Sequence, residues 1–163
     1  MTARTEGDDL AFADKHFTAR LTEELSELIA AQSEDLFRAF GIDIPVKSCS
    51  LMLAIRACEP ASARTLSDAL VRSHQLVSQK LPKLLRLGLI AIEDDPADGR
   101  QKLYRLTAEG RAQLARFQDL RRSLENAYDG LERDAGPLSQ VLRAAIGALR
   151  AQPLADRVPV GTD

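Results

Sequence analysis

Residues 84–110 read LLRLGLIAIEDDPADGRQKLYRLTAEG, and this stretch decides the fold. Gly88 closes an apolar run of helical character, since glycine readily takes the left-handed conformation that ends a helix. Residues 89–93 and 100–106 then alternate apolar and polar side chains, and the segment between them is dense in turn formers. Thr107 is suited to cap a new helix. The stretch therefore predicts a helix, a β-hairpin and a second helix, in that order.

Upstream of the hairpin, three helices are predicted. Asp43 is suited to cap the first of them, with Pro45 in its first turn and Pro60 as its stop. Ser73 is suited to cap the third. The three predicted helices cover residues 43–58, about 63–70 and about 73–87.

Long amphipathic segments flank this central unit. Apolar side chains recur at helical spacing from Phe17 to a stop near Gly41, and two further helices follow Thr107, separated by Gly136-Pro137. These helices carry more apolar surface than a small three-helix domain can cover, so pairing with a second copy is expected. The expected fold class is mainly α with a small β-hairpin wing, that is, a winged helix-turn-helix flanked by long N- and C-terminal dimerisation helices. The expected divisions are 1–45 for an N-terminal tail and dimerisation helix, 46–106 for the winged helix-turn-helix, 107–151 for the C-terminal dimerisation helices, and 152–163 for a loose tail.

The charge of the chain is unevenly distributed. The net charge is −2, yet residues 71–105 hold seven basic and four acidic side chains, while residues 1–46 hold four basic and ten acidic ones. A DNA-binding surface needs a local basic face rather than a basic chain. Ordinary charge segregation on a protein surface is the alternative explanation.

The predicted helix at residues 73–87 divides into two faces. At ~100° per residue, Val77, Leu81 and Leu84 fall on one side and glutamines fall on the other. Such a helix can pack its apolar side on the domain while its amides meet base edges in a major groove. A plain surface helix is the alternative. We expect Gln75, Ser78 and Gln79 to read bases, and Ser73, His74 and Lys80 to contact the sugar-phosphate backbone, with Lys83 as a further contact.

The predicted hairpin loop is acidic, which should repel DNA unless its charges are specifically arranged. Asp98 lies two residues before Arg100, and its carboxylate could hold the guanidinium in one orientation for entry into a narrow minor groove. Lys102 would then contact the backbone from the adjacent strand. A local surface ion pair of little consequence is the alternative.

At this point the sequence resembles the MarR-type winged helix-turn-helix regulators, the multiple-antibiotic-resistance repressor family. Their wing region has Gly-Leu, a hydrophobic strand, an Asp-Pro-x-Asp-x-Arg turn, a second strand and a Leu-Thr-x-x-Gly helix start. The residues that match are Gly88-Leu89, Asp95-Pro96, Asp98, Arg100, Leu106-Thr107 and Gly110.

The resemblance implies a homodimer that places two recognition helices and two wings on a palindromic operator in double-stranded DNA. It further implies a cytoplasmic transcriptional regulator, expected to be a repressor, and a small aromatic or phenolic effector lodged between the dimer helices and the DNA-binding lobe. The competing hypothesis is a winged-helix protein-interaction module without DNA binding, with which the net charge and the acidic wing are compatible.

Two positions depart from the family pattern. Val71-Arg72 stands where the family tends to have glycine before the recognition helix, and a branched residue resists positive φ, so a different turn geometry is expected. Pro82 lies inside the predicted recognition helix and should kink it, which bears on the contacts expected of Lys83 and Arg86.

Other functional classes have little support in the sequence. Cys49 and Cys58 would face opposite sides of one helix and suit a reducing cytosol, so inert core thiols are expected rather than redox sensors, with Cys49 the less clear case. His16 and His74 have no metal-ligand spacing, and no glycine-rich phosphate loop is present. No stretch is long and apolar enough to cross a membrane. Neither a catalytic residue nor a metal or cofactor site is therefore expected.

Overall fold

The computed structural model describes residues 17–158. The expectations for the N-terminal tail and for His16 lie outside this range. The chain divides into two compact units, Met1–Asp119 and Leu120–Asp163.

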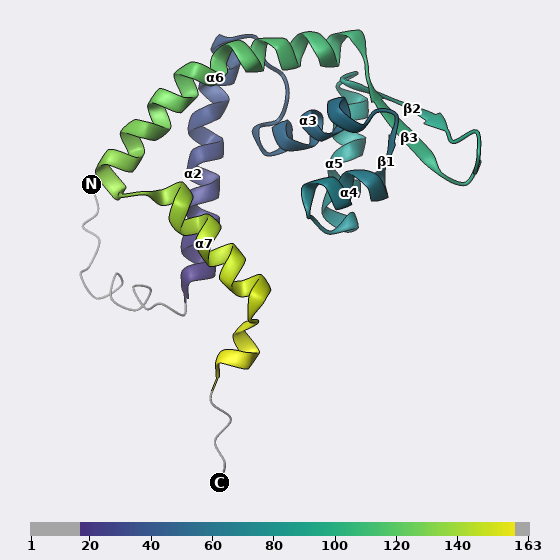
Figure 1. Ribbon diagram of the computed structural model, residues 1–163. Coiled ribbons are helices and arrows are strands. Elements are labelled where there is room, and N and C mark those ends of the chain that lie inside the picture. The colour runs from purple at the N-terminus through teal and green to yellow at the C-terminus, as the bar shows by residue number, and fades with distance from the viewer. Residues whose placement is uncertain (1–16, 159–163) are drawn as a thin grey trace, which may run out of the picture. The chain divides into compact units, whose positions relative to one another are not determined.

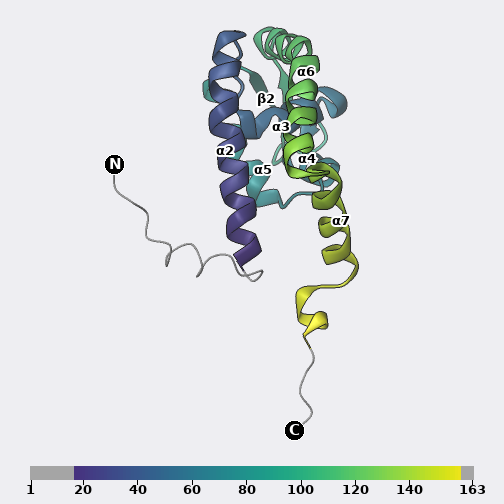
Figure 2. The same ribbon diagram turned by 90° about the vertical axis from the view of Figure 1, so that its left-hand side faces the viewer.

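The first unit contains the predicted helices. The long α2 is unbroken (Figure 2), and a 3-10 turn, η2, leads into the three short helices of the domain. The last of these short helices starts after Ser73 and ends before Gly88, as predicted. The elements are α2 (Thr18–Ala39), η2 (Val46–Ser48), α3 (Cys49–Cys58), α4 (Ala63–Leu70) and α5 (His74–Arg86), followed after the sheet by α6 (Ala108–Ala135), which begins in this unit and continues into the second.

The predicted hairpin is confirmed as β2 (Ile90–Asp94) and β3 (Lys102–Leu106), which project away from the short helices (Figure 1). They are antiparallel, with Ile92 opposite Tyr104. A two-residue strand that the sequence does not predict, β1 (Ala61–Ser62), pairs with the other edge of β3 and gives the order β1-β3-β2. Two residues are too few to show an alternating pattern, so β1 is detectable only from its pairing.

The core of this unit lies where the three short helices meet the sheet. Val77, Leu81 and Leu84 are all at most 2% exposed, which confirms the apolar face predicted for α5. Other elements contribute the remaining core side chains, chiefly Leu51, Met52 and Ile55 from α3, Leu66 from α4, and Leu106 from β3.

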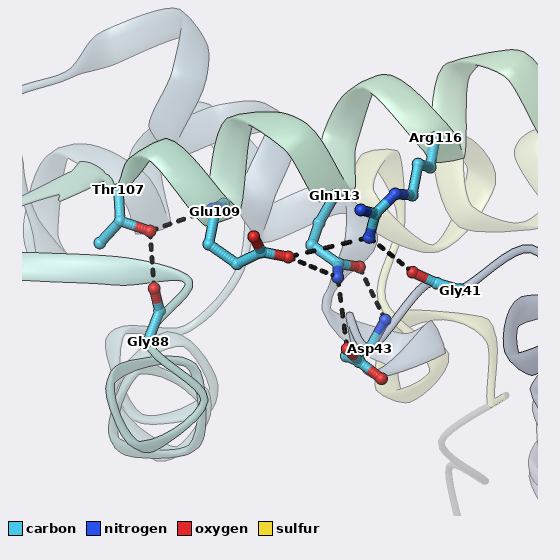
Figure 3. Close-up of polar contacts among 8 residues, drawn as sticks. Gly41, Asp43, Gly88, Thr107, Glu109, Gln113 and Arg116 are labelled. Carbon is cyan, nitrogen blue, oxygen red and sulfur yellow. Dashed lines mark hydrogen bonds and ion pairs between the residues drawn. The ribbon is translucent and has the colours of Figure 1, made fainter.

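The helix expected to start at Asp43 starts later. Residues 42–45 precede η2, and Asp43 caps no helix, because a residue 70 positions away occupies its polar groups. The backbone N–H of Asp43 donates to Gln113 Oε1 at 2.7 Å, and Gln113 Nε2 donates to Asp43 Oδ2 at 3.3 Å (Figure 3). A tertiary contact has therefore replaced the local cap.

The expectation for Val71 is also wrong. Val71 takes the left-handed conformation, with φ 51° and ψ 46°, so the turn before α5 keeps the geometry that glycine would favour. Hydrogen bonds hold the turn closed: Val71 N–H donates to Asp68 O at 3.1 Å, and Arg72 N–H donates to Ser67 O at 3.0 Å. The tertiary fold thus imposes a conformation that a β-branched side chain resists.

The second unit contains the rest of α6, followed by α7 (Leu138–Ala151) and η3 (Leu154–Arg157). Ser139 N–H donates to Glu132 Oε1 at 2.8 Å. Hydrogen bonding by the Ser139 side chain, and then by this N–H, lowers the pKa of the Glu132 carboxyl. The tail expected to be loose from residue 152 is ordered as far as η3, where Arg157 donates to Gln152 O at 3.0 Å and to Ala148 O at 2.8 Å. Across residues 17–158, none of the helices combines the length and the apolar character that a membrane span requires.

Gly110 lies in the first turn of α6, pressed against the start of the hairpin. A β-carbon on Gly110 would lie 1.9 Å from the backbone oxygen of Leu89. We expect Gly110→Ala to lower the free energy of unfolding by roughly 2 kcal/mol or more, since backbone on both sides must move. Urea unfolding measures this. The matched control is Gly147→Ala in α7, which has no heavy atom within 4 Å and should be slightly stabilising. Equal effects of the two substitutions would contradict the close approach.

The left-handed Val71 gives a second prediction. Its side chain is 64% exposed, so replacement loses little burial. Because asparagine tolerates this conformation and a β-branched residue does not, we expect Val71→Asn to raise the free energy of unfolding by about 1 kcal/mol. Val71→Ile keeps the branch and should bring no gain. Thermal or urea unfolding of the three proteins checks this, and a stabilising Val71→Ile would contradict the strain.

Candidate nucleic-acid interface

The exposed face of α5 presents most of the predicted base-reading residues. Ser73 caps the helix, its Oγ accepting a hydrogen bond from Leu76 N–H at 3.3 Å. Ser78 is half-buried, and its hydroxyl lies 3.3 Å from His74 Nδ1 one turn earlier. The residues of the predicted site that are exposed on this helix or at its cap are Ser73, His74, Gln75, Gln79 and Lys83.

Pro82 does not end the helix. α5 continues through it to Arg86, and Lys83 and Arg86 are exposed in the last turn. The proline itself is exposed, so its ring is accommodated on the outer side of the helix. Both cations therefore remain on the same helix as Gln75 and Gln79.

Lys80 differs from its predicted neighbours. Its ammonium group donates to the backbone oxygen of Lys47, at the start of η2, and is held against the domain. Burial lowers the pKa of Lys80, and the nearby charges of Arg72 and Lys47 lower it further. In this arrangement Lys80 does not project with the glutamines, which the sequence pattern alone could not reveal.

The acidic residues of the wing loop organise its backbone. Asp95 accepts hydrogen bonds from Ala97 N–H and from Gln101 Nε2, both at 2.8 Å, and these bonds lower the pKa of the Asp95 carboxyl. Asp98 Oδ1 accepts from the backbone N–H of Arg100 at 3.1 Å. The expected contact of the Asp98 carboxylate with the Arg100 guanidinium is not among the ion pairs of the described residues. Asp98 therefore positions Arg100 through its backbone rather than through its charge.

Two cross-strand ion pairs neutralise the other wing cations. Lys102 pairs with Asp94, and Arg105 pairs with Glu93. Exposed pairs of this kind add little stability, typically 0–1 kcal/mol. Within the described part of the chain no ion pair involves Arg100, which is exposed at the loop, so it carries the uncompensated positive charge of the wing.

A groove of about 420 Å³ lies between the wing and the first turns of α4 and α5. Arg64, which is not among the predicted site residues, lines it from α4, and Arg100 and Lys102 line it from the wing. In the sequence, Arg64 is marked only as a basic residue in the first turn of the helix before α5. That feature alone is a weak indication of a binding role. The remaining lining residues are Ser62, Ala63, His74, Ser78, Asp98, Gln101 and Tyr104.

A second cavity, of about 510 Å³, lies between α2 and the short helices. Three cationic side chains, those of Lys47, Arg72 and Lys80, line it. The remaining wall is largely apolar, with Val46, Leu51, Leu70, Leu76 and Val77, and Ser26 and Ser50 contribute hydroxyl groups. This lining suits a small molecule with an apolar body and a negative group.

The two cysteines are unpaired, and Cys49, the less clear case in the sequence, lies in the core as expected, while Cys58 is only partly buried. Cys49 is the buried one, and burial raises the pKa of its thiol to about 12, so the reactive thiolate is scarce at neutral pH. Cys58 is half-buried at the end of α3. Among residues 17–158, no three His, Cys, Asp or Glu side chains are grouped as a metal site would need.

The comparison with protein families gives one match: residues 42–101 match the model of the MarR family. This range includes η2, α3, β1, α4, α5, β2 and the whole wing loop up to the start of β3. No curated protein matches the chain.

Many solved structures share the fold. The transcriptional repressor CouR bound to a 23-mer DNA duplex is 18% identical, with a TM-score of 0.65 over 89% of this chain and 99% of that chain. The S. aureus MepR–DNA complex is 21% identical, with a TM-score of 0.63 over 80% and 97%. The PcaV regulator from Streptomyces coelicolor in complex with its natural ligand is 20% identical, with a TM-score of 0.61 over 91% and 99%. At these identities the likeness establishes the fold.

Proposed function

We propose that the chain is a MarR-type transcriptional regulator that binds double-stranded DNA as a homodimer, since its winged-helix segment, residues 42–101, matches the model of that family. The observation that carries this proposal is the pairing of an exposed polar face on α5 with an uncompensated arginine on the wing. A helix of this kind enters a major groove, and a wing arginine enters the adjoining minor groove.

The residues have distinct roles in this proposal. Gln75, Ser78 and Gln79 read base edges, and Arg100 enters the minor groove. The backbone phosphates are contacted by Ser73, His74 and Lys102, by Lys83 in the last turn, and by Arg64 across the groove. Lys80 contributes only if it leaves the Lys47 carbonyl.

The unpartnered apolar surface supports the homodimer. In the first unit, Leu21 and Leu28 of α2 are 46% and 52% exposed. In the second unit, Val141, Ile146 and Leu149 of α7 are between 46% and 57% exposed. A second copy of the chain would cover these side chains by the two-fold symmetry usual for homodimers. It would also place two recognition helices on half-sites separated by about 34–36 Å, one turn of DNA.

DNA binding is tested by fluorescence anisotropy with random duplex and with duplexes selected from a random library, each at several salt concentrations. We expect Arg100→Ala to weaken binding and to flatten the salt dependence by roughly one charge. Gln79→Ala should instead change the base preference at one position of each half-site. Arg121→Ala removes a charge outside the winged-helix segment and serves as control.

Two outcomes would contradict these roles. An unchanged salt slope for Arg100→Ala removes Arg100 from the interface, and equal weakening on all sequences by Gln79→Ala makes Gln79 a backbone contact. Binding to no duplex, or binding with no steep salt dependence, would favour the protein-interaction module instead.

The cavity between α2 and the short helices supports a second part of the proposal. In it, the protein is a repressor, and binding of a small aromatic acid in this cavity releases it from DNA. Its occupant would contact both α2 and α5, so it could favour one separation of the recognition helices over another. The three cations would hold a carboxylate or phenolate group, and the leucine and valine side chains would cover the ring.

This is tested with 4-hydroxybenzoate as probe. We expect it to release the protein from its selected duplex and to lose that effect in Ser26→Leu, which fills the cavity from α2. Thr22→Leu, one turn earlier on the same helix, is the matched control and should respond as the wild type does. Release that is equally strong in both variants would place the effector elsewhere.

A further inference from the structure

Gln113 is a buried polar side chain that the DNA-contacting surface does not use. It lies in the second turn of α6 and is 1% exposed. Its Oε1 accepts from Asp43 N–H at 2.7 Å, and its Nε2 donates to Glu109 Oε1 at 2.8 Å and to Asp43 Oδ2 at 3.3 Å (Figure 3). Both amide protons and the amide oxygen are engaged, so the side chain is held in one orientation.

Two further contacts fasten the same part of α6 to the end of α2. Arg116 donates to Gly41 O at 2.9 Å and lies 3.8 Å from the Glu109 carboxylate (Figure 3). The rings of Phe37 and Phe117 meet with centroids 5.7 Å apart. The connection that follows α2 is thus tied to α6 by polar and aromatic contacts together.

Hydrogen bonds and close packing also join the start of α6 to the end of α5. Thr107 Oγ1 donates to Gly88 O at 2.6 Å, and Thr107 N–H donates to Leu89 O at 3.1 Å. Gly110 leaves no room for a β-carbon against Leu89. Residues 107–117 therefore join the C-terminal end of the recognition helix to the C-terminal end of α2 (Figure 3).

We propose that Gln113 is a positioning residue that fixes the recognition helix relative to α2, and through α2 sets the separation of the two recognition helices in the dimer. The proposal rests on the DNA-binding dimer proposed above. Among the contacts at this joint, Gln113 is the buried side chain that bonds the main chain of the connection after α2. Without it, the Asp43 N–H loses its partner and the joint can adopt more than one angle.

A looser joint predicts a particular change in DNA binding. The wild type should strongly prefer half-sites at one spacing, because a misplaced half-site leaves one recognition helix without its contacts. A dimer whose joint flexes can follow a shifted half-site, so its preference for spacing falls. Its affinity for random duplex should hardly change, since that affinity depends on charge rather than on register.

The experiment compares the selected duplex with two versions that carry one base pair inserted or deleted between the half-sites. We expect the wild type to bind the altered duplexes about 100-fold more weakly than the selected one. For Gln113→Met, which keeps the length but removes the bonds, this ratio should fall to about 10-fold or less. Gln118→Met is the same exchange at an exposed position of α6 and should keep the wild-type ratio.

Thermal unfolding is recorded in parallel, and Arg116→Ala, which removes the bond to Gly41, gives a second and milder variant. Its spacing ratio should fall in the same direction even if Gln113→Met fails to fold. A spacing ratio that stays at the wild-type value in a folded variant overturns the positioning role, whatever the melting temperature does. A wild type that binds no duplex would instead refute the DNA-binding function, and the positioning role with it.

Discussion

The close approach of Gly110 to Leu89 is the constraint on which the arrangement of the winged-helix unit depends. The backbone oxygen of Leu89 occupies the place that any side chain at position 110 would need. This allows Thr107 to cap α6 and, at the same time, to bond Gly88 at the end of α5. The end of α5, the start of the wing and the start of α6 therefore meet at one point. A displacement of the start of α6 would therefore also displace the end of α5.

The acidic side chains of the wing stabilise its local structure. In the wing, Asp95 and Asp98 accept hydrogen bonds from the loop backbone, while Asp94 and Glu93 pair with the cations of β3. The net charge of −2 is thus compatible with a positive contact surface. At the other end of the domain, Glu59 bonds both Leu106 N–H and Arg111, and so holds the end of β3 to α3 and α6.

Much of the fold follows from the local pattern of residues. The sequence-based predictions that were wrong concern positions where a distant part of the chain decides the conformation. The bounds of α4 and the capping of α5 by Ser73 are as predicted, because short-range hydrogen bonds and one apolar face decide them. The conformation of Val71, the role of Asp43 and the orientation of Lys80 are not. Each of these depends on contacts with residues that are distant in the sequence or on the packing of the surrounding helices.

The sequence by itself determined the order of the elements, the apolar face of α5 and the position of the turn at the wing. These are properties of periodicity and turn chemistry, which act over a few neighbouring residues. Only the tertiary structure decided three hydrogen bonds. Asp98 accepts from the backbone N–H of Arg100, Lys80 donates to the backbone oxygen of Lys47, and Gln113 accepts from the backbone N–H of Asp43. A hydrogen bond needs its two groups within about 3 Å, and for distant residues only the packed chain fixes that distance.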